Sequence, residues 1–183
     1  VLPVLDTWMA TRRAHLARIC AVRLANAIAM CQRLGAPSVG VDFGPATTCD
    51  VVSRDGDYLG GALMTGIEVS LDALTERGAR LPKVELAPPR TVIGKNTIDA
   101  IRSGVVFGYA GAIDVILRRL YAELGQHADV VATGGFVGLV VPYTEAIQQV
   151  NDMLTPTRLR LLAAAHSATA GLPYRKITGC AGR

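Results

Sequence analysis

The sequence has 183 residues, half of them hydrophobic, and a formal net charge of +4, which suits one globular domain with a buried core. This composition excludes a disordered chain, and scattered basic residues with only 5% aromatic residues argue against nucleic-acid binding. Charged residues interrupt every apolar run before it reaches the length of a membrane span, so we expect no membrane contact.

The cysteine pattern points to a cytoplasmic protein. Four cysteines lie far apart without a CxxC pair: Cys20, Cys31, Cys49 and Cys180. This is neither a zinc pattern nor a compact disulfide framework, and we expect reduced, mostly buried thiols. The N-terminus also lacks the charged-then-apolar plan of a signal peptide.

The first predicted elements are a helix and a strand. Residues 7–34 contain no Gly or Pro and are followed by Gly35 and Pro37, which predicts a helix with a glycine stop. Residues 38–43 then alternate, with valines and Phe43 on one face and Asp42 on the other, which predicts a strand.

Two further strands are expected over 47–53 and 58–65. The Asp55-Gly56 pair between them is a hairpin signal, so the three strands predict an antiparallel meander. A helix over 66–80 and a short extended piece over 83–87 follow.

The longest periodic segment predicts a helix of about eight turns. Its apolar stripe is Ile98, Ile101, Val105, Tyr109, Ile113, Ile116, Leu120 and Leu124. This stripe either packs into the core or forms an interface with a partner. Gly104, Gly108 and Gly111 in the same segment predict close approach by another backbone.

The last predicted elements are a strand over 129–133, a helix after Gly134-Gly135 and a helix over 159–170. A meander followed by helices and one later strand indicates an α/β layered domain.

Three loops could carry chemistry. Asp42 ends a strand just before a glycine turn, where it either binds a cation beside a phosphate or is satisfied by turn amides. Gly134 and Gly135 either let a nucleotide approach the backbone or form a plain turn. At the start of the long helix, Asn96 or Thr97 is either the N-cap or a ligand contact.

Six motifs occur in the order and spacing of one family. They are Asp-Phe-Gly-x-Ala-Thr-Thr from Asp42, Tyr-Leu-Gly-Gly-Ala from Tyr58, Gly-Ile-Glu-Val-Ser-Leu-Asp-Ala-Leu from Gly66, Lys-Val-Glu-Leu-Ala-x-Pro-Arg from Lys83, Ile-Gly-Lys-Asn-Thr from Ile93 and Ala-Thr-Gly-Gly from Ala132. From about Ile19 to Leu161 the sequence resembles the C-terminal half of type III pantothenate kinases, a family that includes the Bvg accessory factor proteins.

The resemblance implies an actin-like (ribonuclease H-like) ATPase fold and a homodimer. It also implies phosphorylation of pantothenate to 4′-phosphopantothenate in coenzyme A synthesis, using ATP, a divalent metal such as Mg²⁺ and a monovalent cation, K⁺ or NH₄⁺. We therefore expect a helical segment over 1–37, an actin-like kinase domain over 38–170 and a tail over 171–183.

The resemblance assigns roles to several residues. Asp42 matches the monovalent-cation ligand, and Arg23 and Thr97 match pantothenate contacts, with Asn26 fitting beside Arg23. The nucleotide-binding positions are Gly44, Thr47, Gly134 and Gly135.

The sequence departs from the family pattern at three places. Val22 stands where the family has its catalytic aspartate, Pro45 replaces a threonine that contacts ATP, and the phosphate loop Asp-x-Gly-Asn-Thr is absent. Loss of a general base typically costs about 10²–10⁴ in rate. We expect an impaired kinase in which Val22→Asp alone does not restore activity.

Three functions remain open at this stage. The first is a pantothenate kinase or a divergent remnant of one. The second is a non-catalytic or regulatory protein that keeps affinity for pantothenate or nucleotide. The third is a structural remnant that dimerises. Turnover separates the first from the others, and ligand binding separates the second from the third.

Overall fold

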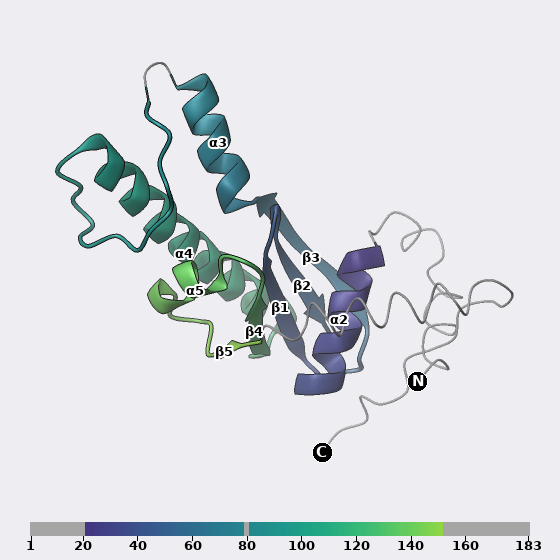
Figure 1. Ribbon diagram of the computed structural model, residues 1–183. Helices are drawn as coiled ribbons and strands as arrows, with labels where there is room; N and C mark the ends of the chain where they lie inside the picture. Colours follow the sequence, from purple (N-terminus) through teal and green to yellow (C-terminus); the bar gives the residue numbers. More distant parts are fainter. Residues whose placement is uncertain (1–20, 79–80, 152–183) are drawn as a thin grey trace, which may run out of the picture.

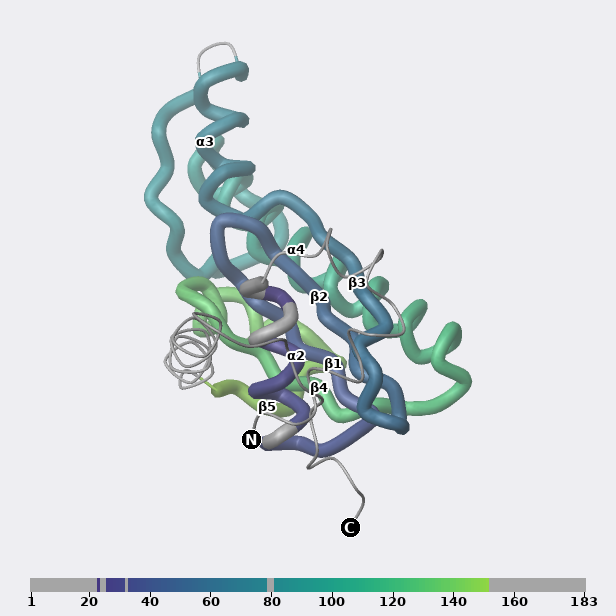
Figure 2. Tube along the Cα trace, turned by 90° about the vertical axis from the view of Figure 1, so that its right-hand side faces the viewer, coloured from purple at the N-terminus to yellow at the C-terminus, as the bar shows by residue number. Residues whose placement is uncertain are grey.

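The computed structural model describes residues 21–78 and 81–151, which form one sheet with helices on both of its faces (Figures 1 and 2). The helices are α2 (Ala21–Leu34), α3 (Ile67–Arg77), α4 (Thr97–Leu124), α5 (Val137–Val140) and the 3₁₀ turn η1 (Val141–Tyr143). The strands are β1 (Ser38–Phe43), β2 (Ala46–Val52), β3 (Tyr58–Thr65), β4 (Asp129–Thr133) and β5 (Gln149–Val150).

The strand order is β3-β2-β1-β4-β5. The first three strands pair antiparallel, whereas β1 pairs parallel with β4 and β4 with β5. The predicted meander and later strand are therefore confirmed, and β5 is an addition that the sequence pattern did not indicate. Because β1 and β4 are parallel, their carboxyl ends meet at one edge of the sheet, where ligands commonly bind in α/β proteins.

The two faces of the sheet bury different groups, because successive side chains of a strand point to opposite sides. Val39, Val41 and Phe43 are fully buried in a core that contains Ile113 and Leu117 of α4. The other face carries α2, whose Ala27 and Met30 belong to a second buried cluster with Val131. In Figure 2, α2 lies in front of the strands and α4 behind them.

The predicted stripe of α4 is only partly correct. Tyr109 and Ile113 are buried as expected, but Ile98 is 40% exposed. The buried face also includes Ser103, Val106, Ala110 and Leu117, so it is rotated from the predicted one. The expected stripe left out the large apolar Val106 and Leu117 as well as small residues such as Ala110, all of which are buried.

The glycines of α4 do not have the predicted role. A Cβ placed at Gly104, Gly108 or Gly111 would meet nothing within 4 Å in the described part of the chain. No described backbone approaches them. Gly104 and Gly108 instead line an open groove of about 470 Å³ between α4 and α3.

The remaining predicted elements differ in their bounds. The helix expected over 66–80 is α3, which ends at Arg77, and the piece over 83–87 is extended chain without sheet pairing. The helix after the glycine pair is a single turn, α5, continued by η1. The helix expected over 159–170 and the tail over 171–183 lie outside the described residues.

Two expectations about composition need correction. Cys49 is a free, buried thiol as expected, but Cys31 is disulfide-bonded. By length and composition α4 is also long and apolar enough to cross a membrane, contrary to the sequence-based expectation. Its isoleucines, valines and alanines give it that apolar character, and a core helix of a soluble protein passes the same criterion. One such helix is weak evidence of a membrane span.

Candidate functional site

A group of polar side chains lies on the sheet face that α2 covers. We call it the α2 cluster, and it consists of Arg23, Asn26, Asp42, Thr48, Asp50, Tyr58 and Thr133. On α2, Arg23 and Asn26 are three residues apart and therefore share a side of the helix. On the sheet, Asp42 is in register with Thr48 of β2 and with Thr133 of β4, so the three side chains share a face.

Asp42 lies at the carboxyl end of β1, next to α2. The amide Nδ2 of Asn26 donates to its Oδ2 at 3.3 Å. Thr133 stands opposite on β4, and its buried Oγ1 has no hydrogen-bond partner among the described residues. A carboxylate beside an unpaired hydroxyl is an oxygen-rich setting that suits a cation.

Asp50 is the centre of the cluster and only 1% exposed. The Nε of Arg23 donates to its Oδ1 at 2.8 Å, and the hydroxyl of Tyr58 donates to the same oxygen at 2.8 Å. The Nη2 of Arg23 lies 2.8 Å from that oxygen as well, as an ion-pair contact. The hydroxyl of Thr48 donates to Oδ2 at 3.4 Å. Every donor to this buried carboxylate in the described part of the chain therefore belongs to the cluster.

Sequence reasoning found Arg23 and Asp42 but missed Asp50, Tyr58 and Thr133. One signal was available: Asp50 is a carboxylate between Cys49 and Val51 within a predicted strand, and the structure buries it with nearly the whole strand. A buried carboxylate needs hydrogen-bond donors, so its presence in such a strand indicates a polar partner elsewhere in the fold.

Burial is the main cause of the pKa shifts in this region. Desolvation raises the pKa of the Asp50 carboxyl, while the hydrogen bond from Tyr58 and the charge of Arg23 act in the opposite direction. Burial and the nearby Asp50 also raise the pKa of Tyr58. On the opposite face, burial raises the pKa of the Cys49 thiol to about 12, so this cysteine is a packing residue and not a nucleophile.

The raised pKa of Asp50 predicts a pH-dependent stability difference between wild type and Asp50→Asn. Above pH 3.8 the unfolded chain releases the Asp50 proton, while the folded chain retains it up to its higher pKa. In that interval the folded state binds more protons, so rising pH favours unfolding. The unfolding free energy of wild type minus that of Asp50→Asn should therefore fall as pH rises from about 4. Urea unfolding of both proteins at half-unit pH steps measures it, and a difference that grows with pH would contradict the assignment.

Glycines bring three loops together at the carboxyl end of β1. Gly134 has a φ of +106°, and a Cβ there would lie 2.5–2.7 Å from the backbone of Phe43. A Cβ at Gly66 would likewise overlap the carbonyls of Gly44 and Pro45. The amide of Gly66 donates to the Pro45 carbonyl at 3.0 Å. The turn before β2 is therefore held between the loops that precede α3 and α5.

The predicted nucleotide residues meet around this turn, with different surroundings. Gly44 lies in the turn itself, where its amide donates to Ala46 at 3.3 Å. The Oγ1 of Thr47 is buried without a hydrogen-bond partner among the described residues. Gly135 has open space where a Cβ would be, unlike Gly134. Gly134 therefore has a packing role, whereas Gly135 is the glycine of the pair with space beside it for a ligand.

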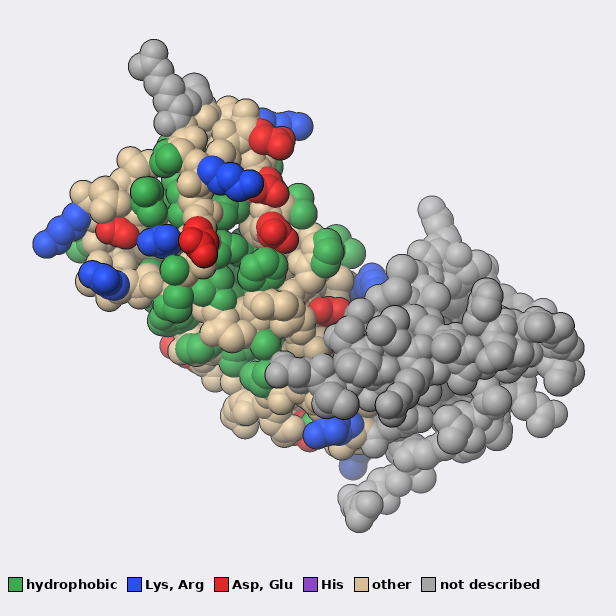
Figure 3. Space-filling view, in the orientation of Figure 1, with side chains coloured by type: hydrophobic (Ala, Val, Ile, Leu, Met, Phe, Trp, Pro, Cys, Tyr) green, Lys and Arg blue, Asp and Glu red, His purple; other side chains and the backbone are tan. Residues whose placement is uncertain are grey.

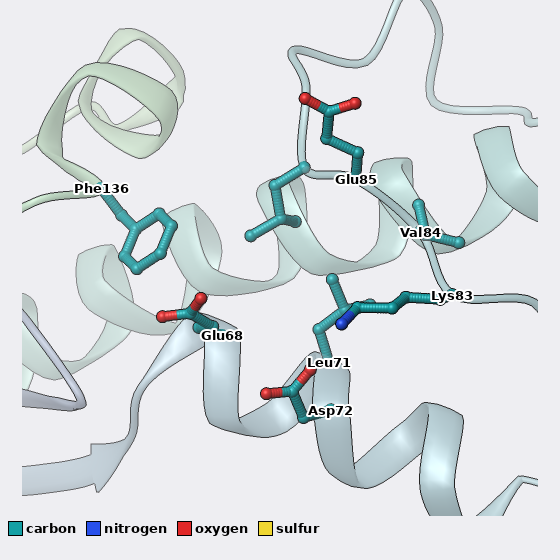
Figure 4. A pocket seen from close by; sticks show the side chains of 8 residues that line it. Glu68, Leu71, Asp72, Lys83, Val84, Glu85 and Phe136 are labelled. Carbon is teal, nitrogen blue, oxygen red and sulfur yellow. The ribbon is translucent and has the colours of Figure 1, made fainter.

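A cleft of about 620 Å³ opens beside the same loops (Figure 4). Phe136 lines it from the segment before α5, and Glu68, Leu71 and Asp72 line it from α3. The facing wall is the segment of Lys83, Val84, Glu85 and Leu86. Charged side chains gather over this part of the surface in Figure 3, with hydrophobic ones below them. The cleft is large enough for a small ligand and carries more acidic than basic groups.

Three other predicted positions lie apart from the α2 cluster or cannot be placed in it. Asn96 is the N-cap of α4, accepting from the amide of Asp99 at 2.9 Å, which confirms the capping alternative for this loop. Thr97 begins α4 at the end of the molecule away from α2 (Figure 1). The backbone of Val22 lies in α2, but its side chain is outside the described set.

Sequence comparison connects these features to known proteins. The family model for type III pantothenate kinase matches residues 5–119, so the similarity begins earlier than the expected limit at Ile19. A type III pantothenate kinase of Frankia alni is 49% identical over 140 residues, which cover 76% of this chain and 56% of that protein. That of Moorella thermoacetica is 42% identical over 160 residues, which cover 87% of this chain and 63% of that protein. The chain thus spans somewhat more than half the length of these relatives.

Structural comparison agrees on the fold. A Baf family protein from Campylobacter jejuni superposes with a TM-score of 0.52 at 21% identity, covering 79% of this chain and 65% of that one. The arrangement is of the actin-like ATPase type, as expected from the sequence. With more than half of its residues matched by the family model and relatives above 40% identity, the chain belongs to the type III pantothenate kinase family.

Proposed function

We propose that this chain binds pantothenate and ATP as part of a pantothenate kinase, and that its own phosphoryl transfer is slow. The observation that carries the proposal is the meeting of Arg23 and Asp42 in the α2 cluster. These residues come from different elements, and the fold brings both to one sheet face, where Arg23 contacts Asp50 and Asn26 contacts Asp42. A guanidinium there suits the carboxylate of pantothenate.

A monovalent cation fits the residues present. Asp42 supplies a carboxylate and Thr133 a buried hydroxyl with no partner among the described residues. Within the described chain no group of three His, Cys, Asp or Glu side chains could hold a metal. A divalent metal would therefore depend largely on the ATP phosphates for its ligands. A cation bound at Asp42 would help to offset the negative charge of the phosphates.

The nucleotide is proposed to lie along the loops at the carboxyl end of β1. We assign Gly44 and Thr47 to the phosphate end, because a turn offers backbone amides there. The cleft beside Phe136 suits the base and ribose better than the phosphates, because the carboxylates of Glu68 and Asp72 repel anions. Gly135 is proposed to lie beside the nucleotide, since no described atom lies within 4 Å of where its Cβ would be.

Arg23→Gln tests the pantothenate part of the proposal. Removing the guanidinium should raise the Kd for pantothenate by about 10- to 100-fold, the usual range for a lost charge-assisted hydrogen bond. Isothermal titration calorimetry measures this change. Arg33→Gln is the matched control, because Arg33 is an exposed arginine in the last turn of the same helix. Equal affinity of the two variants would contradict the assignment of Arg23.

A second function is favoured by Val22. A valine cannot accept the proton of the substrate hydroxyl, so a pantothenate- or nucleotide-binding protein without turnover is the alternative. Mass-spectrometric detection of 4′-phosphopantothenate in the presence of ATP, Mg²⁺ and K⁺ separates the two. Fast turnover by the wild-type chain would contradict the impairment that we assign to Val22. Binding of both ligands without product would favour the alternative.

A further inference from the structure

Asp50 lies between two glycines of the neighbouring strands. Its Cα partners are Gly40 on β1 and Gly61 on β3. Neither partner has a side chain, and the Met30 sulfur of α2 takes the space over Gly40, 2.9 Å from where a Cβ would be. Arg23 and Tyr58 both reach the same oxygen of the buried carboxylate, Oδ1.

The contact leaves part of the Arg23 guanidinium available. The side chain is 21% exposed, and among the described residues only its Nε donates a hydrogen bond. Its Nη2 is buried and makes no hydrogen bond there, although it lies against Asp50. A guanidinium has more N–H donors than one carboxylate oxygen accepts. Some N–H donors of Arg23 therefore remain for a second carboxylate while Asp50 binds the side of the guanidinium that carries Nε.

We propose that Asp50 is a positioning residue that fixes the Arg23 guanidinium for the carboxylate of the ligand. This rests on the proposed function, since it takes Arg23 to be the pantothenate contact. A free arginine side chain loses rotamer entropy when it binds a ligand. Asp50 imposes that order before the ligand arrives, and pre-organisation of this kind strengthens binding. Tyr58 assists by holding the Asp50 carboxylate in place.

A purely structural role for Asp50, tying α2 to the sheet, makes a different prediction. Loss of this contact between α2 and the sheet would weaken the binding of all ligands alike or would only lower the stability of the fold. Loss of positioning would weaken ligands that carry a carboxylate and spare those that do not. Pantothenate and pantothenyl alcohol differ in this one group, so their comparison separates the two roles.

The experiment uses the full chain and compares wild type, Asp50→Asn and Tyr58→Phe. Asp50→Asn should raise the Kd for pantothenate by about 10-fold or more while changing that for pantothenyl alcohol less than about twofold. In the Arg23→Gln background, Asp50→Asn should have no further effect. Tyr58→Phe keeps the charge of Asp50 and should give a smaller loss of the same selectivity, which covers the case that Asp50→Asn does not fold. Asp55→Asn, an exposed aspartate of the β2–β3 hairpin, should leave both affinities unchanged.

A second readout is independent of pantothenate. The Arg23 Nε–H resonance, identified by its loss in Arg23→Gln, should be protected from exchange in wild type and lose that protection in Asp50→Asn. Unchanged pantothenate affinity in folded Asp50→Asn, or an unprotected wild-type resonance, would overturn the inference. A protected resonance in a wild-type chain that does not bind pantothenate would overturn the proposed function and, with it, the ligand role of Asp50, while the Arg23–Asp50 pairing itself would stand.

Discussion

Gly134→Ala should destabilise the protein by at least about 3 kcal/mol, which corresponds to a fall in Tm of roughly 6–12 °C. Two effects combine at this position. The backbone φ of +106° is one that residues with a Cβ rarely adopt, and the added Cβ would lie 2.5–2.7 Å from the Phe43 backbone. Backbone atoms cannot move aside as a flexible side chain would, so the loop before α5 must shift away from β1.

Gly135→Ala is the matched control for this prediction. It makes the same chemical change one residue later, where a Cβ would meet no described atom within 4 Å. We expect its stability to stay within about 1 kcal/mol of wild type. Thermal unfolding followed by circular dichroism compares the two variants. Equal stability of both would show that the glycine pair is a plain turn without close packing. A loss of ATP affinity in Gly135→Ala, with stability retained, would support its proposed place beside the nucleotide.

The strands were predictable because their signals are local. Val39, Val41 and Phe43 alternate with less buried residues, and the period of two alone fixes which side faces the core. Gly56 adopts a positive φ in the turn between β2 and β3, which the Asp-Gly pair had indicated. The strand β5 had no such signal. It has two residues and exists only through its pairing with β4.

From local sequence signals the candidate site was predictable only where a residue stands at the end of an element, and Arg23 was identified through the family resemblance alone. Asp42 was identified because it closes a strand before a glycine turn. Asp50 lies inside a strand, and its partner Arg23 is 27 residues away in the sequence. No short-range pattern connects the two, since they meet only after α2 packs on the sheet. The buried hydroxyl of Thr133 likewise becomes informative only when β4 is placed in register with Asp42.

Phe43→Ala is expected to cost about 3–5 kcal/mol in the free energy of unfolding. The Phe43 side chain is fully buried and is one of the largest in the core between the sheet and α4. Its removal leaves a cavity that the surrounding valines and Ile113 cannot fill without moving β1. The same residue separates Asp42 from Gly44, so the variant also tests whether the candidate site depends on that core.

The control for Phe43→Ala is Leu63→Ala, which removes a large apolar side chain that is 62% exposed on β3. Its cost should stay below about 1 kcal/mol, because most of that side chain is already in water. Urea unfolding gives both free energies, and similar losses in the two variants would contradict the placement of the core. If the turn after β1 is positioned by Phe43, the folded fraction of Phe43→Ala should bind ATP more weakly than wild type, while Leu63→Ala should bind it equally well. The packing of one aromatic ring would then connect the stability of the sheet to the geometry of the loops that the nucleotide is proposed to contact.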